Sequence, residues 1–211
     1  MQNAPKTDGI LNAMQARPAT PSAHGHAVQF YGTDESLFTT VASFLAAGLV
    51  AGQPAVVIAT FSHRIPIVNH LRERLIDCDR ALRNGDLILL DAEATLDLFM
   101  VNDEPDPELF ESNVGRLLDQ AINSRPRIVL RAYGEMVDVL WKQGRSEAAI
   151  KLEIMWNKLA TKYDFALLCG YSMGSFYKQT QQLEEVIALH TCVVAHDTNV
   201  VTFPPQRPHI A

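Results

Sequence analysis

The sequence of 211 residues has few cysteines, no excess of positive charge and no long apolar run, and each absence excludes a class of protein. Three widely spaced cysteines do not form a disulfide framework. A net charge of −6, from 18 basic and 24 acidic residues, disfavours direct binding of nucleic-acid phosphates. Apolar stretches such as Val41–Val50 are far shorter than the roughly 20 residues of a membrane span. With no secretory signal visible, we expect a cytoplasmic protein that contacts neither nucleic acid nor a membrane.

The two ends of the chain differ in composition from its centre. Residues 1–25 are rich in Ala, Pro, Thr, Ser and Asn and show no sustained periodicity, so we expect a flexible N-terminal lead. Three prolines in Phe203–Ala211 predict a C-terminal tail over residues 200–211. The sequence therefore predicts one folded domain over residues 26–199.

Within this domain, strand-like apolar runs alternate with segments of helical periodicity. The strand-like runs are Ala27–Tyr31, Ala55–Ala59, Leu87–Leu90, Ile128–Leu130 and Phe165–Cys169. Helices are expected from Asp34 until Gly52 stops the first, over Ile65–Cys78, after Asp91, from Pro107 to about Ser124, over Ser146–Tyr163 and over Tyr177–His190. Strands that alternate with helices imply parallel crossovers. The predicted fold is a three-layer α/β domain with a mainly parallel sheet and helices on both faces.

Polar and aromatic residues follow these strands and define a candidate ligand site. In parallel α/β sheets, ligands bind beyond the carboxyl ends of the strands. We predict that Arg131, Tyr133 and Glu135 line the principal pocket, approached by His63 and Arg64 from a neighbouring turn. The alternative is that these strand ends are polar only because they meet water. The nine predicted ligand-binding residues are Tyr31, Thr60, His63, Arg64, Asp91, Arg131, Tyr133, Glu135 and Tyr171.

Signatures of catalysis are weak. The turn Thr60–Arg64 has no glycine and no Lys-Ser/Thr pair, so it lacks a phosphate-binding loop and ATP hydrolysis is disfavoured. Nucleotide binding without hydrolysis remains open, with Arg64 or Arg131 as an anion clamp and Glu135 as a base. Glu135 acting only as a helix cap is the alternative. The segment Gly170–Gly174 resembles a nucleophile elbow only loosely. No catalytic residue is assigned, and enzyme activity is not favoured.

A metal site is a further open possibility. His190, Cys192 and His196 carry ligand atoms, but their spacing is not a standard zinc pattern, and Cys192 lies in an apolar run typical of a core. His24 and His26 would join such a site only through tertiary proximity. Glu153 and Asn157 lie one turn apart on one helix, where a surface or interhelical hydrogen bond is expected. The sequence assigns no metal ligands, and the cofactor is unknown.

Several segments together resemble a known family. They are His26–Tyr31, Phe44–Gly52, Val57–Arg64, Gly85–Met100, Arg131–Trp141, Leu152–Asn157 and Leu168–Tyr171. In order and spacing they resemble the MEDS family, a sensory domain named for methanogens, methylotrophs and a dichloromethane-responsive regulator. The resemblance covers about residues 26–196. It implies a RecA/KaiC-like domain without a Walker A loop that serves as a sensor input in signalling proteins.

The resemblance also bears on ligand and partner. Ligands of the family are inferred to be small hydrocarbon derivatives, and its members are often attached to histidine-kinase or DNA-binding modules. This chain has neither module, so the expected function is a sensory domain that binds a small molecule at the strand ends and signals through a separate kinase or regulator. A nucleotide-binding protein or an enzyme that uses the same crevice is the alternative.

An apolar stripe near the C-terminus suggests self-association. Leu183, Val186, Ile187 and Leu189 share a helix face and precede the apolar run Cys192–Val194. The stripe either packs on the sheet or is covered by a second copy. Because two-fold dimers are the commonest assembly, we predict a homodimer with the stripe at or near its interface.

Overall fold

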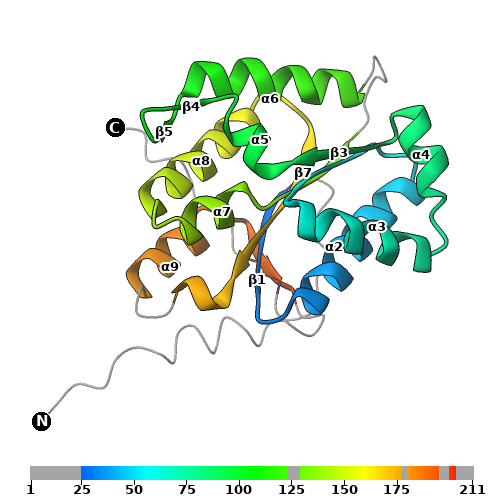
Figure 1. Ribbon diagram of the computed structural model, residues 1–211, viewed down its shortest axis with the longest axis horizontal. Coiled ribbons are helices and arrows are strands. Elements are labelled where there is room, and N and C mark those ends of the chain that lie inside the picture. The colour runs from blue at the N-terminus through cyan, green and yellow to red at the C-terminus, as the bar shows by residue number, and fades with distance from the viewer. Residues whose placement is uncertain (1–24, 123–128, 177–179, 195–199, 203–211) are drawn as a thin grey trace, which may run out of the picture.

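The computed structural model describes residues 25–122, 129–176, 180–194 and 200–202 (Figure 1). The strands are β1 Gly25–Tyr31, β2 Ala55–Ala59, β3 Leu87–Asp91, β4 Met100–Val101, β5 Glu104–Pro105, β6 Leu130–Gly134, β7 Phe165–Ser172, β8 Cys192–Val194 and β9 Val200–Thr202. The helices are α2 Asp34–Val50, α3 Phe61–Glu73, α4 Cys78–Asn84, α5 Ala92–Leu96, α6 Pro107–Ile122, α7 Met136–Lys142, α8 Ser146–Leu159 and α9 Thr180–Ala188, with a short 3₁₀ helix at Met173–Phe176. Among these helices, none is long and apolar enough to cross a bilayer.

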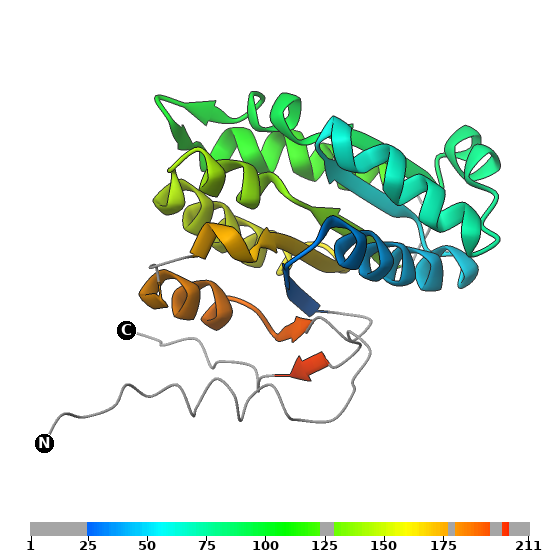
Figure 2. The same ribbon diagram turned by 60° about the horizontal axis from the view of Figure 1, so that its bottom comes forward.

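Seven strands form the main sheet in the order β3-β2-β6-β7-β1-β8-β9. Six of them run parallel, and β9 is antiparallel to β8. Figure 2 shows β8 and β9, in orange and red, continuing the sheet beyond β1 in blue. The sheet therefore includes Val200–Thr202, which the sequence analysis assigned to the tail. Strands β4 and β5 form a separate antiparallel pair.

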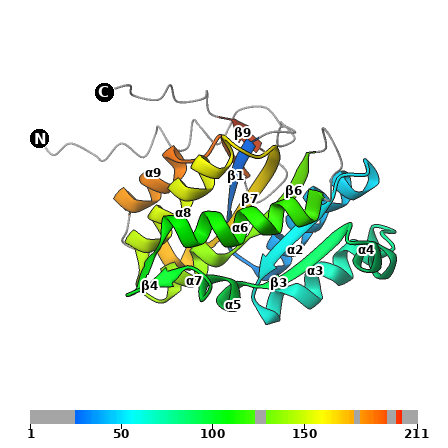
Figure 3. The same cartoon turned by 90° about the horizontal axis from the view of Figure 1, so that it is seen from above.

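Successive side chains of a strand point to opposite faces of the sheet. All five residues of β2 are apolar and buried, so both faces need a cover of helices. Val57 of β2 packs in the core beneath α2, α3 and α4, whereas its neighbour Ile58 packs in the core beneath the other five helices. Figure 3 shows α6 and α8 on one side of the strands and α2 and α3 on the other. The structure thus confirms the predicted three-layer α/β fold.

The helix predicted over Ile65–Cys78 ends earlier in the structure, and a second helix begins at Cys78. Helix α3 begins earlier, at Phe61, and ends at Glu73. Leu75 then adopts a positive φ of 61°, which turns the chain out of the helix. Asp77 begins α4 by accepting a hydrogen bond from the Arg80 N–H, and Gly85 ends it at φ 73°. The missed boundary had a readable signal, an Asp N-cap followed by a glycine C-cap.

The strands β6 and β7 extend further than predicted. Arg131 and Tyr133 lie inside β6 instead of beyond its end, and Tyr171 lies inside β7. Arg131 pairs in register with Ala55, the first residue of the parallel strand β2. The prediction that Arg131 lies at the carboxyl edge is therefore wrong, since it lies near the amino end of its strand. Ile128 lies outside the described residues.

The apolar stripe near the C-terminus is covered within the chain. Val186 of α9 is fully buried, and Leu183, Ile187 and Leu189 pack against the core that includes α8. The three residues of β8 are buried in the sheet. The stripe therefore packs on its own domain, which was the other outcome considered for it. The homodimer stays a prediction, now without this stripe as its support.

Candidate functional site

Polar side chains gather at the carboxyl edge of the sheet. Tyr31 and Asp91 end β1 and β3, Thr60 and Glu135 follow β2 and β6, and His63 lies in the first turn of α3. Because these four strands are parallel, their ends lie at one edge. The structure thus places these five residues at one edge of the sheet.

Glu135 is the centre of this edge and is almost completely buried. One carboxylate oxygen, Oε1, accepts the Thr60 N–H at 2.6 Å. The other, Oε2, accepts hydrogen bonds from His63 Nδ1 and from the Tyr133 hydroxyl, each at 2.8 Å. Both oxygens therefore have donors that come from the protein itself. We call Glu135 and these three partners the Glu135 network.

The protonation states follow from these contacts. Burial would raise the pKa of Glu135, but the hydrogen bond and positive charge of His63, together with Thr60, hold that pKa below its usual value. The same hydrogen bond raises the pKa of His63 above its ordinary value, against the effect of burial. Burial and the neighbouring carboxylate raise the pKa of Tyr133, so it stays a donor. When His63 is protonated, the network is a buried ion pair with an extra hydroxyl donor.

A second buried carboxylate, Asp138 of α7, adjoins the Glu135 network. Its Oδ2 accepts from the Tyr31 hydroxyl at 2.9 Å and lies 2.7 Å from Lys142 Nζ, while its Oδ1 accepts the Ser172 N–H at 3.0 Å. Burial and Asp138 raise the pKa of Tyr31 far above its usual range. Ser172 ends β7, so the loosely elbow-like segment is strand followed by a 3₁₀ helix and not a strand–turn–helix elbow.

Beside this edge, α3, α4 and β3 border a groove of about 270 Å³ lined mostly by apolar side chains. Phe61 and Ile65 of α3 are large apolar residues that are 70% and 56% exposed there. Arg64 donates to Asp91 Oδ2 at 2.9 Å, but its buried Nε has no hydrogen-bond partner in the structure. We call this the α3 groove; it is lined by Phe61, Arg64, Ile65, Val68, Arg72, Leu82 and Leu89.

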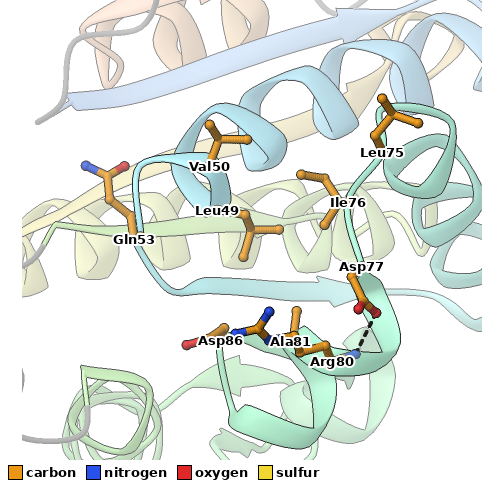
Figure 4. A pocket seen from close by; sticks show the side chains of 10 residues that line it. Leu49, Val50, Gln53, Leu75, Ile76, Asp77, Arg80, Ala81 and Asp86 are labelled. Carbon is orange, nitrogen blue, oxygen red and sulfur yellow. Dashed lines mark hydrogen bonds between the residues drawn. The ribbon is translucent and has the colours of Figure 1, made fainter.

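Arg131 lies away from these groups. Its Nε donates to Gln53 Oε1 at 2.9 Å and its guanidinium lies 4.9 Å from the centre of the Phe44 ring, while burial lowers its pKa. Figure 4 shows a second groove at this amino edge, lined by Gln53, Arg80 and other residues, with a volume of about 250 Å³. Neither of these two grooves is lined by Arg131, Tyr133 or Glu135. Ligand binding by the nine predicted residues stays a prediction.

A second polar cluster lies fully buried under the sheet, on the side of α8. Glu153 Oε2 is 3.1 Å from His26 Nε2 and 3.4 Å from Cys169 Sγ, and its Oε1 is 3.4 Å from His190 Nε2 and accepts from the Tyr171 hydroxyl at 2.9 Å. The ligand atoms of His26, Glu153, Cys169 and His190 lie within 4.8 Å of one another. We call these four residues the Glu153 cluster.

The Glu153 cluster differs from the metal ligands considered from the sequence. Cys192 packs in the core on the opposite face of the sheet, and His24 and His196 lie outside the described residues. His26 joins His190 through tertiary proximity, the one route that the sequence left open. Sequence reasoning missed Cys169 and misjudged Glu153, because the cluster is assembled from four separate elements and has no local spacing.

The turn between β1 and α2 is where a RecA-like sheet would carry a phosphate loop. Here it is Gly32-Thr33, and the Thr33 side chain caps α2 by accepting the Ser36 N–H. A KaiC-like protein from the hyperthermophilic archaeon Pyrococcus horikoshii OT3 is similar in structure, with a TM-score of 0.56 and 14% identity over 81% of this chain and 71% of that chain. The chain therefore has a RecA-like α/β fold. At this identity, the likeness shows the fold alone.

The family is shown by sequence. Residues 25–191 match the model of MEDS, the methanogen/methylotroph, DcmR sensory domain. The match spans most of the chain, so the chain belongs to the MEDS family of sensory domains. No curated protein matches the sequence.

Proposed function

We propose that this chain is a cytoplasmic sensory domain that binds a small molecule at the carboxyl edge of its sheet and signals through a partner protein, a kinase or regulator. Membership of a sensory family supports the role in signalling. The α3 groove, which opens beside the Glu135 network, supports a place for the ligand.

The observation that carries this proposal is the unpaired Nε of Arg64. A buried donor without an acceptor is costly, so it favours an acceptor atom from outside the protein. The neighbouring Phe61 and Ile65 offer apolar area that water solvates poorly. A small apolar molecule with one hydrogen-bond acceptor fits both features, because its body would cover the apolar side chains while a shift of the Arg64 side chain would bring the buried Nε to its acceptor.

Helix α3 provides a route from the groove to the rest of the domain. It carries Arg64 on the groove side and His63, which binds Glu135, on the buried side. Glu135 in turn directly precedes α7. A ligand that shifts α3 would therefore alter the hydrogen bond from His63 and the start of α7. The coupling free energy equals the difference in ligand affinity between the two arrangements.

The alternative, a nucleotide-binding protein or an enzyme with Glu135 as base, receives less support. Glu135 is ionised with a pKa below its usual value, and three donors already occupy it, so it is a weak base. Arg131 lies at the other edge of the sheet and cannot clamp an anion beside it.

Thermal-shift screening tests the proposal. Short-chain alcohols, aldehydes and halogenated hydrocarbons are screened against ATP and flavins, since a bound ligand raises the unfolding temperature by mass action. Hits are titrated by calorimetry against Arg64→Met, with Arg83→Met, an exposed arginine of α4, as the control. We expect Arg64→Met to weaken a small organic hit about tenfold or more, consistent with loss of one charge-assisted hydrogen bond. Hits restricted to nucleotides, with turnover, would instead establish the alternative.

A further inference from the structure

The two imidazoles of the Glu153 cluster are oriented by their outer nitrogens. His190 Nδ1 lies 2.7 Å from the Val186 carbonyl oxygen, which only accepts, so Nδ1 carries the proton. His26 Nδ1 lies 2.9 Å from Asn157 Oδ1. The amide of Asn157 is fixed in turn, because its Nδ2 donates to the Leu189 carbonyl at 2.9 Å. Both rings therefore donate outward through Nδ1 and turn Nε2 toward Glu153.

This orientation leaves the Nε2 atoms of the two histidines, which are acceptors when neutral, facing the carboxylate of Glu153, which is also an acceptor. When both rings are neutral, the outer contacts keep the proton on Nδ1, so both Nε2 atoms carry lone pairs that face the carboxylate of Glu153 at 3.1 and 3.4 Å. Two side chains then offer inward protons: the Tyr171 hydroxyl donates to Glu153 Oε1, and the Cys169 thiol lies 3.4 Å from Glu153 Oε2 and 3.2 Å from His26 Nε2. His190 Nε2 is fully buried and has no hydrogen-bond partner in the structure. A cation between these atoms would satisfy all of them at once.

We propose that the Glu153 cluster is a binding site for a divalent transition metal, with Zn²⁺ as the first candidate. The ligands are the Nε2 atoms of His26 and His190, the Cys169 thiolate and the Glu153 carboxylate. These are the donor types that tetrahedral zinc takes, and its bond lengths place neighbouring ligand atoms about 3.3–3.6 Å apart. The separations of 3.1–3.4 Å between the two Glu153 oxygens and their neighbours lie close to that range, and all four ligand atoms lie within 4.8 Å of one another.

The charges in the site also suit a divalent cation. One thiolate and one carboxylate together carry two negative charges, which a divalent ion neutralises in a volume that excludes water. Imidazole ligates through a nitrogen lone pair, and the outer contact of His26 Nδ1 leaves Nε2 facing the cluster. Cysteine ligates a metal as the thiolate, so metal binding releases the proton of the Cys169 thiol.

The outer hydrogen bonds are those expected around metal-bound histidines. Such ligands donate their other N–H to a carbonyl or carboxylate that fixes the ring. Here the acceptors are the Asn157 side-chain oxygen for His26 and the Val186 carbonyl for His190. The four ligands come from β1, α8, β7 and the residue pair after α9. All four positions are filled by protein, which is typical of a structural site and not of a catalytic one. The metal would fasten α9 and β8 to the core, at a site independent of the α3 groove.

The first experiment is metal titration of the full chain after chelator treatment under reducing conditions. We expect one equivalent of Zn²⁺ per chain, and Co²⁺ in its place should give a tetrahedral ligand-field spectrum with a thiolate charge-transfer band. Cys169→Ser should lose that band. Cys192→Ser, another buried cysteine but outside the cluster, should keep it. Asn157→Leu should weaken Zn²⁺ binding about 10–100-fold. A band lost in Cys192→Ser and kept in Cys169→Ser would overturn the assignment.

A second measurement needs no variant. X-ray absorption of the zinc-loaded wild-type chain should show one sulfur at about 2.3 Å and three nitrogen or oxygen neighbours at about 2.0–2.2 Å. Shells with no sulfur, or with two, would overturn the proposal, as would the absence of stoichiometric binding in the first experiment. Binding with these shells, together with slower hydrogen exchange in α9 and β8, would establish it.

Discussion

Two buried glutamates, Glu135 and Glu153, have similar partners but differ in whether the neighbouring histidines direct an N–H toward the carboxylate. Glu135 and Glu153 each contact histidine and accept from a tyrosine hydroxyl. Around Glu135, every neighbour points a proton at the carboxylate, because His63 presents Nδ1 directly to it and Thr60 offers a backbone N–H. Around Glu153, the two histidines instead donate their Nδ1 protons to Asn157 Oδ1 and to the Val186 carbonyl.

The comparison shows why proximity alone does not identify a ligand site. Both clusters place titratable groups within hydrogen-bond distance, but only one is complete without an added atom. The Glu135 network is a finished structural unit that positions α3 and the start of α7. With neutral histidines, the Glu153 cluster has fewer inward-pointing protons than acceptor atoms, which is the property expected of a metal site. The distinction rests on which nitrogen of each ring has an outer acceptor.

The largest expected effect is the removal of the Glu135 carboxylate. Glu135→Ala leaves three donors without their acceptor in a buried site, and we expect the free energy of unfolding to fall by about 3–5 kcal/mol. Urea unfolding followed by circular dichroism measures it. Glu93→Ala, an exposed glutamate of α5, is the control and should change stability by less than about 0.5 kcal/mol. Equal effects in the two variants would remove the structural role of the network.

Removing the tyrosine hydroxyl that donates to each glutamate should have a smaller effect on the free energy of unfolding, and a different one in the two clusters. In metal-free protein, Tyr171→Phe takes from Glu153 its one hydroxyl donor, and we expect a loss of about 1.5–3 kcal/mol. Tyr133→Phe should lose only about 1 kcal/mol, because Glu135 keeps Thr60 and His63 as donors. Unfolding of both variants in the presence of a chelator tests the order. A larger loss in Tyr133→Phe would contradict the account.

The Glu135 network also predicts a dependence on pH. The pKa of His63 is raised above 6.5, so its contribution is complete below that pH and is lost as pH rises through the folded pKa. The pKa of Glu135 is lowered below 4.5, so its contribution is present above 4.5 and is lost as pH falls through the folded pKa. The pair therefore stabilises most between pH 4.5 and 6.5.

His63→Gln measures this contribution, because the amide still donates to Glu135 but carries no charge. We expect the wild-type chain to exceed the variant by about 1 kcal/mol between these two pKa values. The difference should shrink toward alkaline pH. A difference that stays constant across the whole range would show that His63 is neutral in the folded protein.

Much of the fold is readable from the sequence, for physical reasons that also explain the errors. Runs such as Ala55–Ala59 are buried on both faces and therefore read as strands without ambiguity. Arg131 was misplaced because a charged residue after an apolar run suggests a strand end, whereas here its long side chain reaches along Phe44 to Gln53 from inside β6. The pairing of His26 with Cys169 and Glu153 depends on strand order, which no local pattern encodes.

The smallest predicted effect on stability is that of replacing Arg131, which lies near the amino end of β6. Arg131→Met loses a partly exposed hydrogen bond to Gln53 and the contact with the Phe44 ring, so we expect a loss of less than about 1 kcal/mol. It should leave binding at the α3 groove unchanged, in contrast to Arg64→Met. Calorimetry with a hit from the screen compares the two. If both variants weakened ligand binding equally, Arg131 would belong to the ligand site after all.

The most direct test of the central claim is a matched pair of substitutions in metal-free protein. Glu135→Gln sets an amide N–H₂ against donors, and urea unfolding should show a loss of about 1–3 kcal/mol. Glu153→Gln turns an amide N–H toward the lone pair of His26 Nε2 while its oxygen still accepts from Tyr171, so its stability should change little or rise. A loss in Glu153→Gln as large as that in Glu135→Gln would contradict the account.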